Sequence, residues 1–163
     1  MKPENLIATL LGVGYLRPAS GTWGSLIALP YAALLHVLGG FPLLVAGIVL
    51  AFLVGWWATI RMTAGQEDHD PSHIVVDELV GQWISLLPLS YASWSMGIGI
   101  FVMWPGWIAA FALFRFFDVT KFWLIGWADR RGDPLGVMLD DVIAGVCAAL
   151  GVIALAGLYH GLM

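Results

Sequence analysis

Charge is scarce in this chain of 163 residues. Only 11% of the residues are Asp, Glu, Lys or Arg, whereas soluble domains average about 25%, and 60% of the residues are hydrophobic. This composition predicts one membrane-embedded domain over residues 1–163. The formal net charge of −4 leaves no basic surface of the kind that binds nucleic acid, so that class of partner is excluded.

Cysteine is almost absent. The single Cys147 excludes an intrachain disulfide and a cysteine metal cluster, and its Ala, Gly and Val neighbours predict an inert, buried thiol. The chain also lacks internal repeats of 20–50 residues and low-complexity tracts. Neither a repeat architecture nor a redox site is therefore expected.

Long apolar runs dominate what is present. Each approaches the roughly 20 residues that a helix needs to cross a bilayer. The runs cover about 22–38, 42–60, 79–95, 97–114 and 142–162. Pro88 and several serines interrupt the third run, so we expect four to five membrane helices in an all-α, polytopic protein. Tight connections at 38–42 and 95–97 predict two helical hairpins.

The charged residues fall in the three remaining segments, 1–21, 61–78 and 115–141. If all five runs cross the bilayer, these segments emerge on the same side. They contain all seven Lys and Arg residues, which places that side in the cytoplasm by the positive-inside rule. Carboxylates far apart in the sequence can then meet at one cytoplasmic surface. If residues 79–95 did not span, the last segment would lie on the opposite face.

Two adjacent acid pairs, Asp77–Glu78 and Asp140–Asp141, each precede a glycine one helical turn later. Crowded carboxylates repel one another unless a cation neutralises them, and Mg²⁺ prefers carboxylate oxygens together with water and phosphate. The candidate metal ligands are Asp77, Glu78, Asp118, Asp140 and Asp141. The alternative is that the acids cap helices and complement the helix dipole.

Cationic residues accompany the acids in "FRFFDVTKFW". Arg115, Asp118 and Lys121 recur every three residues, so one helical face would present cation, acid and cation to a phosphate. Salt bridges within the helix are the alternative. The next segment mixes aromatic residues with cations, which predicts a helix lying in the membrane interface and carrying Asp129.

A glycine-rich stretch, "GVGYLRPASGTWGS", could bring backbone N–H groups to an anion near Gly21, Thr22 and Ser25. It lacks the Gly-Lys-Ser/Thr of a nucleotide-binding loop, and a flexible turn before a helix is the alternative. The spacing of His69 and His73 would suit zinc, but Pro71 between them opposes a helix.

Three blocks of the sequence resemble, in order and spacing, the signature blocks of bacterial phosphatidylglycerophosphatase A. The blocks are "VGYLRPASGTWGSLIALP", "DHDPSHIVVDELVGQWISL" and "FALFRFFDVTKFWLIGWADRRGDPLGVMLDDVIAGV". The resemblance implies Mg²⁺-dependent removal of the terminal phosphate of phosphatidylglycerophosphate, giving phosphatidylglycerol in the bacterial inner membrane. The substrate would be a phospholipid in the bilayer. Oligomeric state is not predicted.

The resemblance extends to single positions. Its motif residues fall on Gly21, Thr22, Gly24, Ser25, Asp70, Asp77, Glu78, Gly81, Phe114, Arg115, Asp118, Lys121, Asp140, Asp141, Ala144 and Gly145. Two departures are plain: Ser20 replaces a proline, and "KFWLI" stands where the family usually reads Lys-Pro-Trp-Pro-Ile. The second departure suggests a more helical segment after Lys121 and affects the expected placement of Asp129.

Together, residues and resemblance predict a membrane phosphatase. The expected catalytic residues are Asp141, Asp77, Glu78 and Asp118, with Asp141 as general base or as nucleophile. The expected phosphate-binding residues are Arg115, Lys121, Gly21, Thr22 and Ser25. A divalent-cation transporter would carry acids at mid-bilayer instead, and a non-catalytic assembly protein would have no use for this set of acids and cations.

Overall fold

The computed structural model describes residues 2–65 and 71–161, and within these ranges the chain forms helices and turns without a β-strand. The elements in chain order are α1 (Pro3–Ala8), η1 (Val13–Tyr15), α2 (Ser20–Thr63), α3 (Val76–Ser85), α4 (Leu87–Met96), η2 (Ile100–Met103), α5 (Trp104–Thr120), α6 (Leu124–Asp129) and α7 (Pro134–Gly161). The all-α class predicted from composition is confirmed for the described residues.

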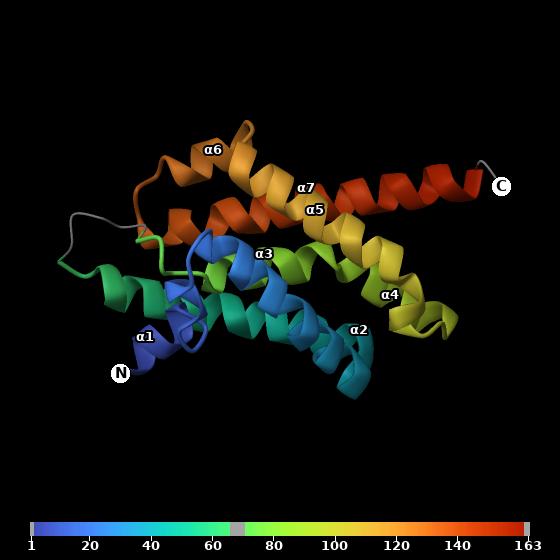
Figure 1. Ribbon diagram of the computed structural model, residues 1–163, viewed down its shortest axis with the longest axis horizontal. Helices are drawn as coiled ribbons and strands as arrows, with labels where there is room; N and C mark the ends of the chain where they lie inside the picture. Colours follow the sequence, from blue (N-terminus) through green and yellow to red (C-terminus); the bar gives the residue numbers. More distant parts are fainter. Residues whose placement is uncertain (1, 66–70, 162–163) are drawn as a thin grey trace.

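Helix α2 is a hairpin of two arms. Its helical dihedral angles break at Gly39 and Gly40, where Gly40 has a positive φ of 66°. Glycine adopts this conformation at little cost, and a Cβ at Gly40 would lie 2.6 Å from Cδ1 of Trp94. The two arms run back along each other (Figure 1). The first predicted hairpin connection is therefore confirmed.

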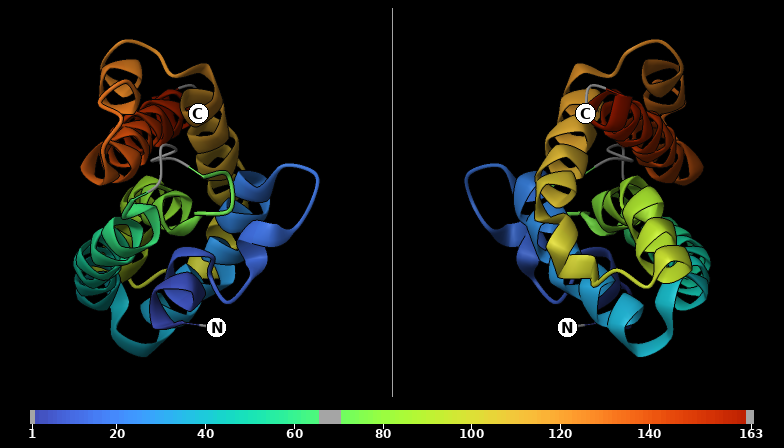
Figure 2. Two further views of the ribbon diagram at one scale, coloured as in Figure 1. Left: turned by 90° about the vertical axis from the view of Figure 1, so that its left-hand side faces the viewer. Right: turned by 90° about the vertical axis from the view of Figure 1, so that its right-hand side faces the viewer.

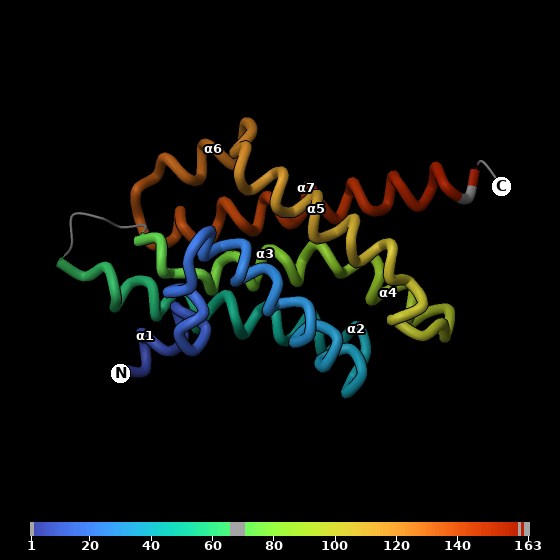
Figure 3. The backbone as a smooth tube through the Cα atoms, viewed as in Figure 1, coloured from blue at the N-terminus to red at the C-terminus, as the bar shows by residue number. Residues whose placement is uncertain are grey.

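Helix α3 forms the centre of the bundle. Helix α4 follows it in about the same direction (Figure 3), and the two arms of α2 together with α5 and α7 surround α3 (Figure 2). Nine of the ten residues of α3 are buried, all except Glu78. Pro88 lies in the first turn of α4, where a missing N–H costs nothing, so the proline separates two short helices within one path.

The apolar exterior fits a membrane-associated protein. Three helical segments are long and apolar enough to cross a membrane, namely Ser20–Thr63, Ile100–Thr120 and Pro134–Tyr159. Exposed large hydrophobic side chains cover α2, α5 and α7. The predicted count of four to five crossings stays a prediction, because α2 contains two arms and the α3–α4 path is not among these segments.

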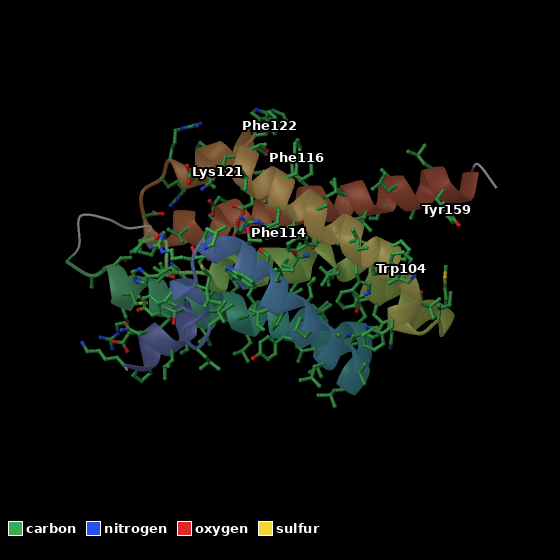
Figure 4. All side chains as sticks on the ribbon, in the orientation of Figure 1. Trp104, Phe114, Phe116, Lys121, Phe122 and Tyr159 are labelled. Carbon is green, nitrogen blue, oxygen red and sulfur yellow. The ribbon has the colours of Figure 1, made fainter. Side chains whose placement is uncertain are left out.

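The charged segments lie at one end of the bundle. The first turns of α2, α3 and α7, the last turn of α5, and α6 all lie at the left of Figure 1. The reversal within α2 and the connection from α4 to α5 lie at the right. Lys121 and Phe122 are at the charged side of the bundle, whereas Trp104 and Tyr159 lie toward the other end (Figure 4). For the described residues, the expectation that the three charged segments share one end is confirmed.

Candidate active site

A cavity of about 320 Å³ opens at the charged end, between the starts of α2, α3 and α7 and the end of α5. Its polar wall consists of Ser20, Gly21, Ser72, Asp77, Glu78, Arg115, Asp118, Lys121, Asp140 and Asp141. This volume is in the range of small-ligand sites. Residues as far apart in the sequence as Ser20 and Asp141 thus face one space.

Two glycines set the distance between α3 and α7. A Cβ at Gly81 would lie 2.5 Å from the carbonyl oxygen of Asp141 and 2.5 Å from Cε2 of Phe114. Across the same crossing, a Cβ at Gly145 would collide with the backbone of Gly81. Only glycine allows the two backbones to come this close, and the close crossing brings Asp77 and Asp141 together.

Three carboxylates converge at this crossing. Asp77, Glu78 and Asp141 each offer an oxygen, and these oxygens all lie within 4.8 Å of one another. Asp77 is 7% exposed and Asp141 is 3% exposed. Oε2 of Glu78 is buried and has no hydrogen-bond partner among the described residues. A group of carboxylate oxygens, one of which is buried without a hydrogen-bond partner, fits a hard divalent cation such as Mg²⁺.

Asp118 and Asp140 border this cluster. The carboxyl group of Asp118 lies within hydrogen-bonding reach of that of Asp141, and Asp140 is close enough to interact electrostatically with it. Oδ1 of Asp140 also accepts a hydrogen bond from the backbone N–H of Asp141 at 2.9 Å. All five predicted metal ligands therefore line one cavity, and three of them have oxygens close enough to share an ion.

The alternative that the acids cap helices and complement the helix dipole fits one acid pair in part, since no side chain caps α3, and is wrong for the other pair. Asp77 and Glu78 lie in the first turn of α3, where the helix dipole favours negative charge. Asp140 and Asp141 lie just beyond the first turn of α7, and that first turn contains no acid. That helix is capped by Asp133, whose Oδ1 accepts a hydrogen bond from the N–H of Gly136 at 2.6 Å.

Arg115 reaches the cavity from α5. Its guanidinium forms an ion pair with Asp118 and donates a weak hydrogen bond to Oγ of Ser25 at 3.4 Å. The Ser25 hydroxyl in turn donates to the carbonyl of Gly21 at 2.8 Å. A side chain at Gly21 would collide with the Glu78 carboxylate, so glycine lets the start of α2 approach the acids.

The predicted phosphate-binding set is only partly brought together. Gly21 lines the cavity, but Thr22 and Ser25 do not. Ser25 is buried and lies behind the cavity wall, where it contacts two residues of that wall, Gly21 and Arg115. Thr22 follows Gly21 in the first turn of α2, and its backbone N–H donates to the carbonyl of Ala19 at 3.0 Å.

Lys121 ends α5 in a left-handed conformation, with φ 47° and ψ 45°. Its Nζ forms an ion pair with Asp129 and donates to Oδ2 of Asp140 at 2.9 Å. Burial alone would lower the pKa of the ammonium group, but the two carboxylates outweigh burial and raise the pKa above its usual range. Asp129 lies on α6, as predicted, and outside the cavity wall.

Sequence reasoning missed two hydroxyl-bearing residues. Ser20 and Ser72 line the cavity, and the Ser20 hydroxyl donates to the Ser72 carbonyl at 2.5 Å. Ser20 belongs to the glycine-rich block, whereas no local pattern marked Ser72. His73 stacks on Tyr15 with ring centroids 5.3 Å apart and does not line the cavity. Two further residues considered from sequence, His69 and Asp70, lie outside the described residues.

The model of one protein family, described as phosphatidylglycerophosphatase A, matches residues 6–156. The chain belongs to the phosphatidylglycerophosphatase A family. A phosphatidylglycerophosphatase A of Haemophilus influenzae is 37% identical over 157 residues, covering 95% of this chain and 90% of the relative. A phosphatidylglycerophosphatase A of Escherichia coli is 34% identical over 149 residues, covering 90% of this chain and 80% of the relative.

A third relative has a different substrate in its name. It is a Bacteroides thetaiotaomicron protein with the provisional name of a phosphatidylinositol-3-phosphatase, and it is 37% identical over 152 residues, covering 86% of each chain. No solved structure matches this chain. All three names describe a phosphatase that acts on a lipid phosphate, but the lipid headgroup differs between the names.

Proposed function

We propose that this protein hydrolyses the terminal phosphomonoester of phosphatidylglycerophosphate, releasing inorganic phosphate and phosphatidylglycerol. The observation that carries the proposal is the convergence of Asp77, Glu78 and Asp141 beside Arg115 in one cavity, at the end of a bundle of apolar helices. Membership of the phosphatidylglycerophosphatase A family supports this substrate. The lipid's acyl chains would remain in the bilayer while the headgroup enters the cavity.

The acids would hold the metal. Asp77, Glu78 and Asp141 are the primary ligands in this proposal, with Asp118 and Asp140 beside them. Bound Mg²⁺ would supply Lewis acidity that draws negative charge from the phosphate. Asp141 would have one of two roles. It accepts a proton from the water that attacks phosphorus, or it attacks phosphorus itself while the P–O bond to the lipid glycerol breaks, the glycerol oxygen takes up a proton, and water then hydrolyses the aspartyl phosphate. Asp118, which contacts the Asp141 carboxyl, would orient it for either role.

The phosphate oxygens would be bound from the opposite wall. The Arg115 guanidinium presents several N–H donors in a plane, which suits a phosphate group. The start of α2 adds the backbone N–H of Gly21, which has no partner within the helix, at the positive end of its dipole. These donors would also stabilise charge that develops during phosphoryl transfer.

Arg115→Lys tests this binding role. Lysine keeps the positive charge but loses the planar arrangement of donors, so we expect KM for the lipid to rise by about tenfold, with a smaller change in kcat. Steady-state phosphate release in mixed micelles measures both constants. A variant with unchanged KM would contradict the role given to Arg115.

We also place the site on the cytoplasmic face of a bacterial inner membrane, with the chain crossing several times. All seven Lys and Arg residues of the sequence fall in segments that emerge at the cavity end of the bundle. A transporter is less well supported, because these acids lie at one end of the helices and not at mid-bilayer.

The deciding experiment measures phosphate release by the purified protein from phosphatidylglycerophosphate, phosphatidic acid and phosphatidylinositol 3-phosphate. We expect turnover of phosphatidylglycerophosphate to exceed that of the other two lipids, to stop on addition of EDTA, and to return with excess Mg²⁺. Hydrolysis that continues in EDTA would contradict the proposed dependence on a metal ion. A preference for phosphatidylinositol 3-phosphate would contradict the substrate.

A further inference from the structure

Lys121 connects the cavity wall to a residue outside it. Its ammonium group contacts Asp140, which lines the cavity and whose side chain is 8% exposed, and Asp129, whose side chain is 35% exposed. The left-handed backbone at Lys121 ends α5 and turns the chain toward α6, which carries Asp129 back to the ammonium group. The two acids come from different helices, α6 and α7, so the lysine bridges them.

The charges at this bridge oppose binding of another anion. One ammonium group faces two carboxylates, so the three side chains sum to −1. A phosphate that approached Nζ would have to displace a carboxylate or overcome repulsion from both. Arg115, in contrast, forms an ion pair with one described acid, Asp118. The direct phosphate contact expected of Lys121 stays a prediction, and these contacts favour a different role.

We propose that Asp129 and Lys121 are positioning residues that act through Asp140. Oδ2 of Asp140 accepts from Lys121, and Oδ1 accepts from the backbone N–H of Asp141. The bridge thereby fixes both oxygens of the Asp140 carboxylate and keeps it beside the proposed metal ligand Asp141. The effect of this role on catalysis rests on the proposed function. The bridge of Asp129, Lys121 and Asp140 itself does not depend on that function.

Asp129→Asn distinguishes positioning from phosphate binding, because the two roles predict different changes in kcat and KM. If the bridge positions Asp140, the substitution loosens Lys121, and kcat falls by about tenfold while KM for phosphatidylglycerophosphate changes less than about twofold. If Lys121 binds phosphate directly, removal of a competing carboxylate frees the ammonium group, and KM falls. Asp129→Glu keeps the charge and should restore most of kcat in the first case.

The matched control is Asp133→Asn. Asp133 lies in the same loop region and pairs with Arg131, away from Lys121, and asparagine can still cap α7. We expect kcat and KM of this variant to stay within about twofold of the unmodified protein. An equal fall of kcat in both variants would overturn the proposal, because it would show a general effect of removing an acid from this loop.

A second readout does not depend on activity. The sequence contains two lysines, Lys2 and Lys121, so NMR of protein labelled with ¹⁵N at lysine side chains gives few signals to assign. In lipid-free micelles at one fixed pH, we expect the Nζ signal of Lys121 to shift in Asp129→Asn, which removes a carboxylate from the ammonium group, and to stay unchanged in Asp133→Asn. An unshifted signal in Asp129→Asn would overturn the bridge. If the protein proves inactive on the lipid, the proposed function fails while this signal still decides whether the bridge exists.

Discussion

Asp141→Asn is expected to lower kcat for phosphatidylglycerophosphate by about 10³-fold. The substitution keeps the size of the side chain and removes the negative charge from the centre of the acid cluster. Both proposed roles of Asp141, as metal ligand and as base or nucleophile, require that charge. Phosphate release at saturating Mg²⁺ and lipid measures the loss.

Although the same variant should lose activity, we expect it to keep or gain stability. Without a divalent cation, Asp141 lies among like-charged carboxylates, and asparagine removes repulsion. In EDTA, we therefore expect Asp141→Asn to melt at the same temperature as the unmodified protein or higher, which would separate a lost site from a lost fold. A variant that is folded and retains more than about a tenth of the activity would contradict the role of Asp141.

Gly81→Ala is expected to damage fold and activity together. The new methyl group would lie 2.5 Å from the Asp141 carbonyl and 2.5 Å from the Phe114 ring, and backbone cannot move aside cheaply. Forced separation of α3 from α7 should cost about 1–3 kcal/mol of stability and draw Asp77 away from Asp141. Thermal unfolding in detergent and phosphate release measure the two effects.

Gly157→Ala is the matched control for this substitution. Gly157 also lies in α7, but a Cβ there meets no atom within 4 Å. We expect wild-type activity and equal or slightly greater stability, because alanine favours the helix more than glycine does. If Gly81→Ala behaved like Gly157→Ala, the close crossing of α3 and α7 would not be what assembles the site.

Much of the architecture follows from local sequence. The Gly39–Gly40 pair predicted the reversal within α2, because a positive φ favours glycine. The uneven distribution of charge predicted that three segments share one end of the bundle. The central position of α3 was harder to predict, because Pro88 and the nearby serines interrupt its apolar run, whereas burial against α2 and α7 sets the path of this helix.

The gathering of the five acids was predicted from topology, and the structure places all of them in one cavity wall. Contacts that depend on tertiary structure were out of reach. The helical spacing of Arg115 and Lys121 suggested one face with two similar cations, but Lys121 lies beyond the last turn of α5 and is bound by two acids. The pairing of Ser20 with Ser72 spans 52 residues and has no local signal.

The most direct test of the central claim is to locate a bound metal ion. Crystals of the purified protein grown with Mn²⁺ in place of Mg²⁺ would reveal the ion by its anomalous scattering. The account predicts a peak in the cavity, ligated by carboxylate oxygens of Asp77, Glu78 and Asp141 and lost in Asp141→Asn. A fully occupied ion elsewhere, with none among these three side chains, would contradict it.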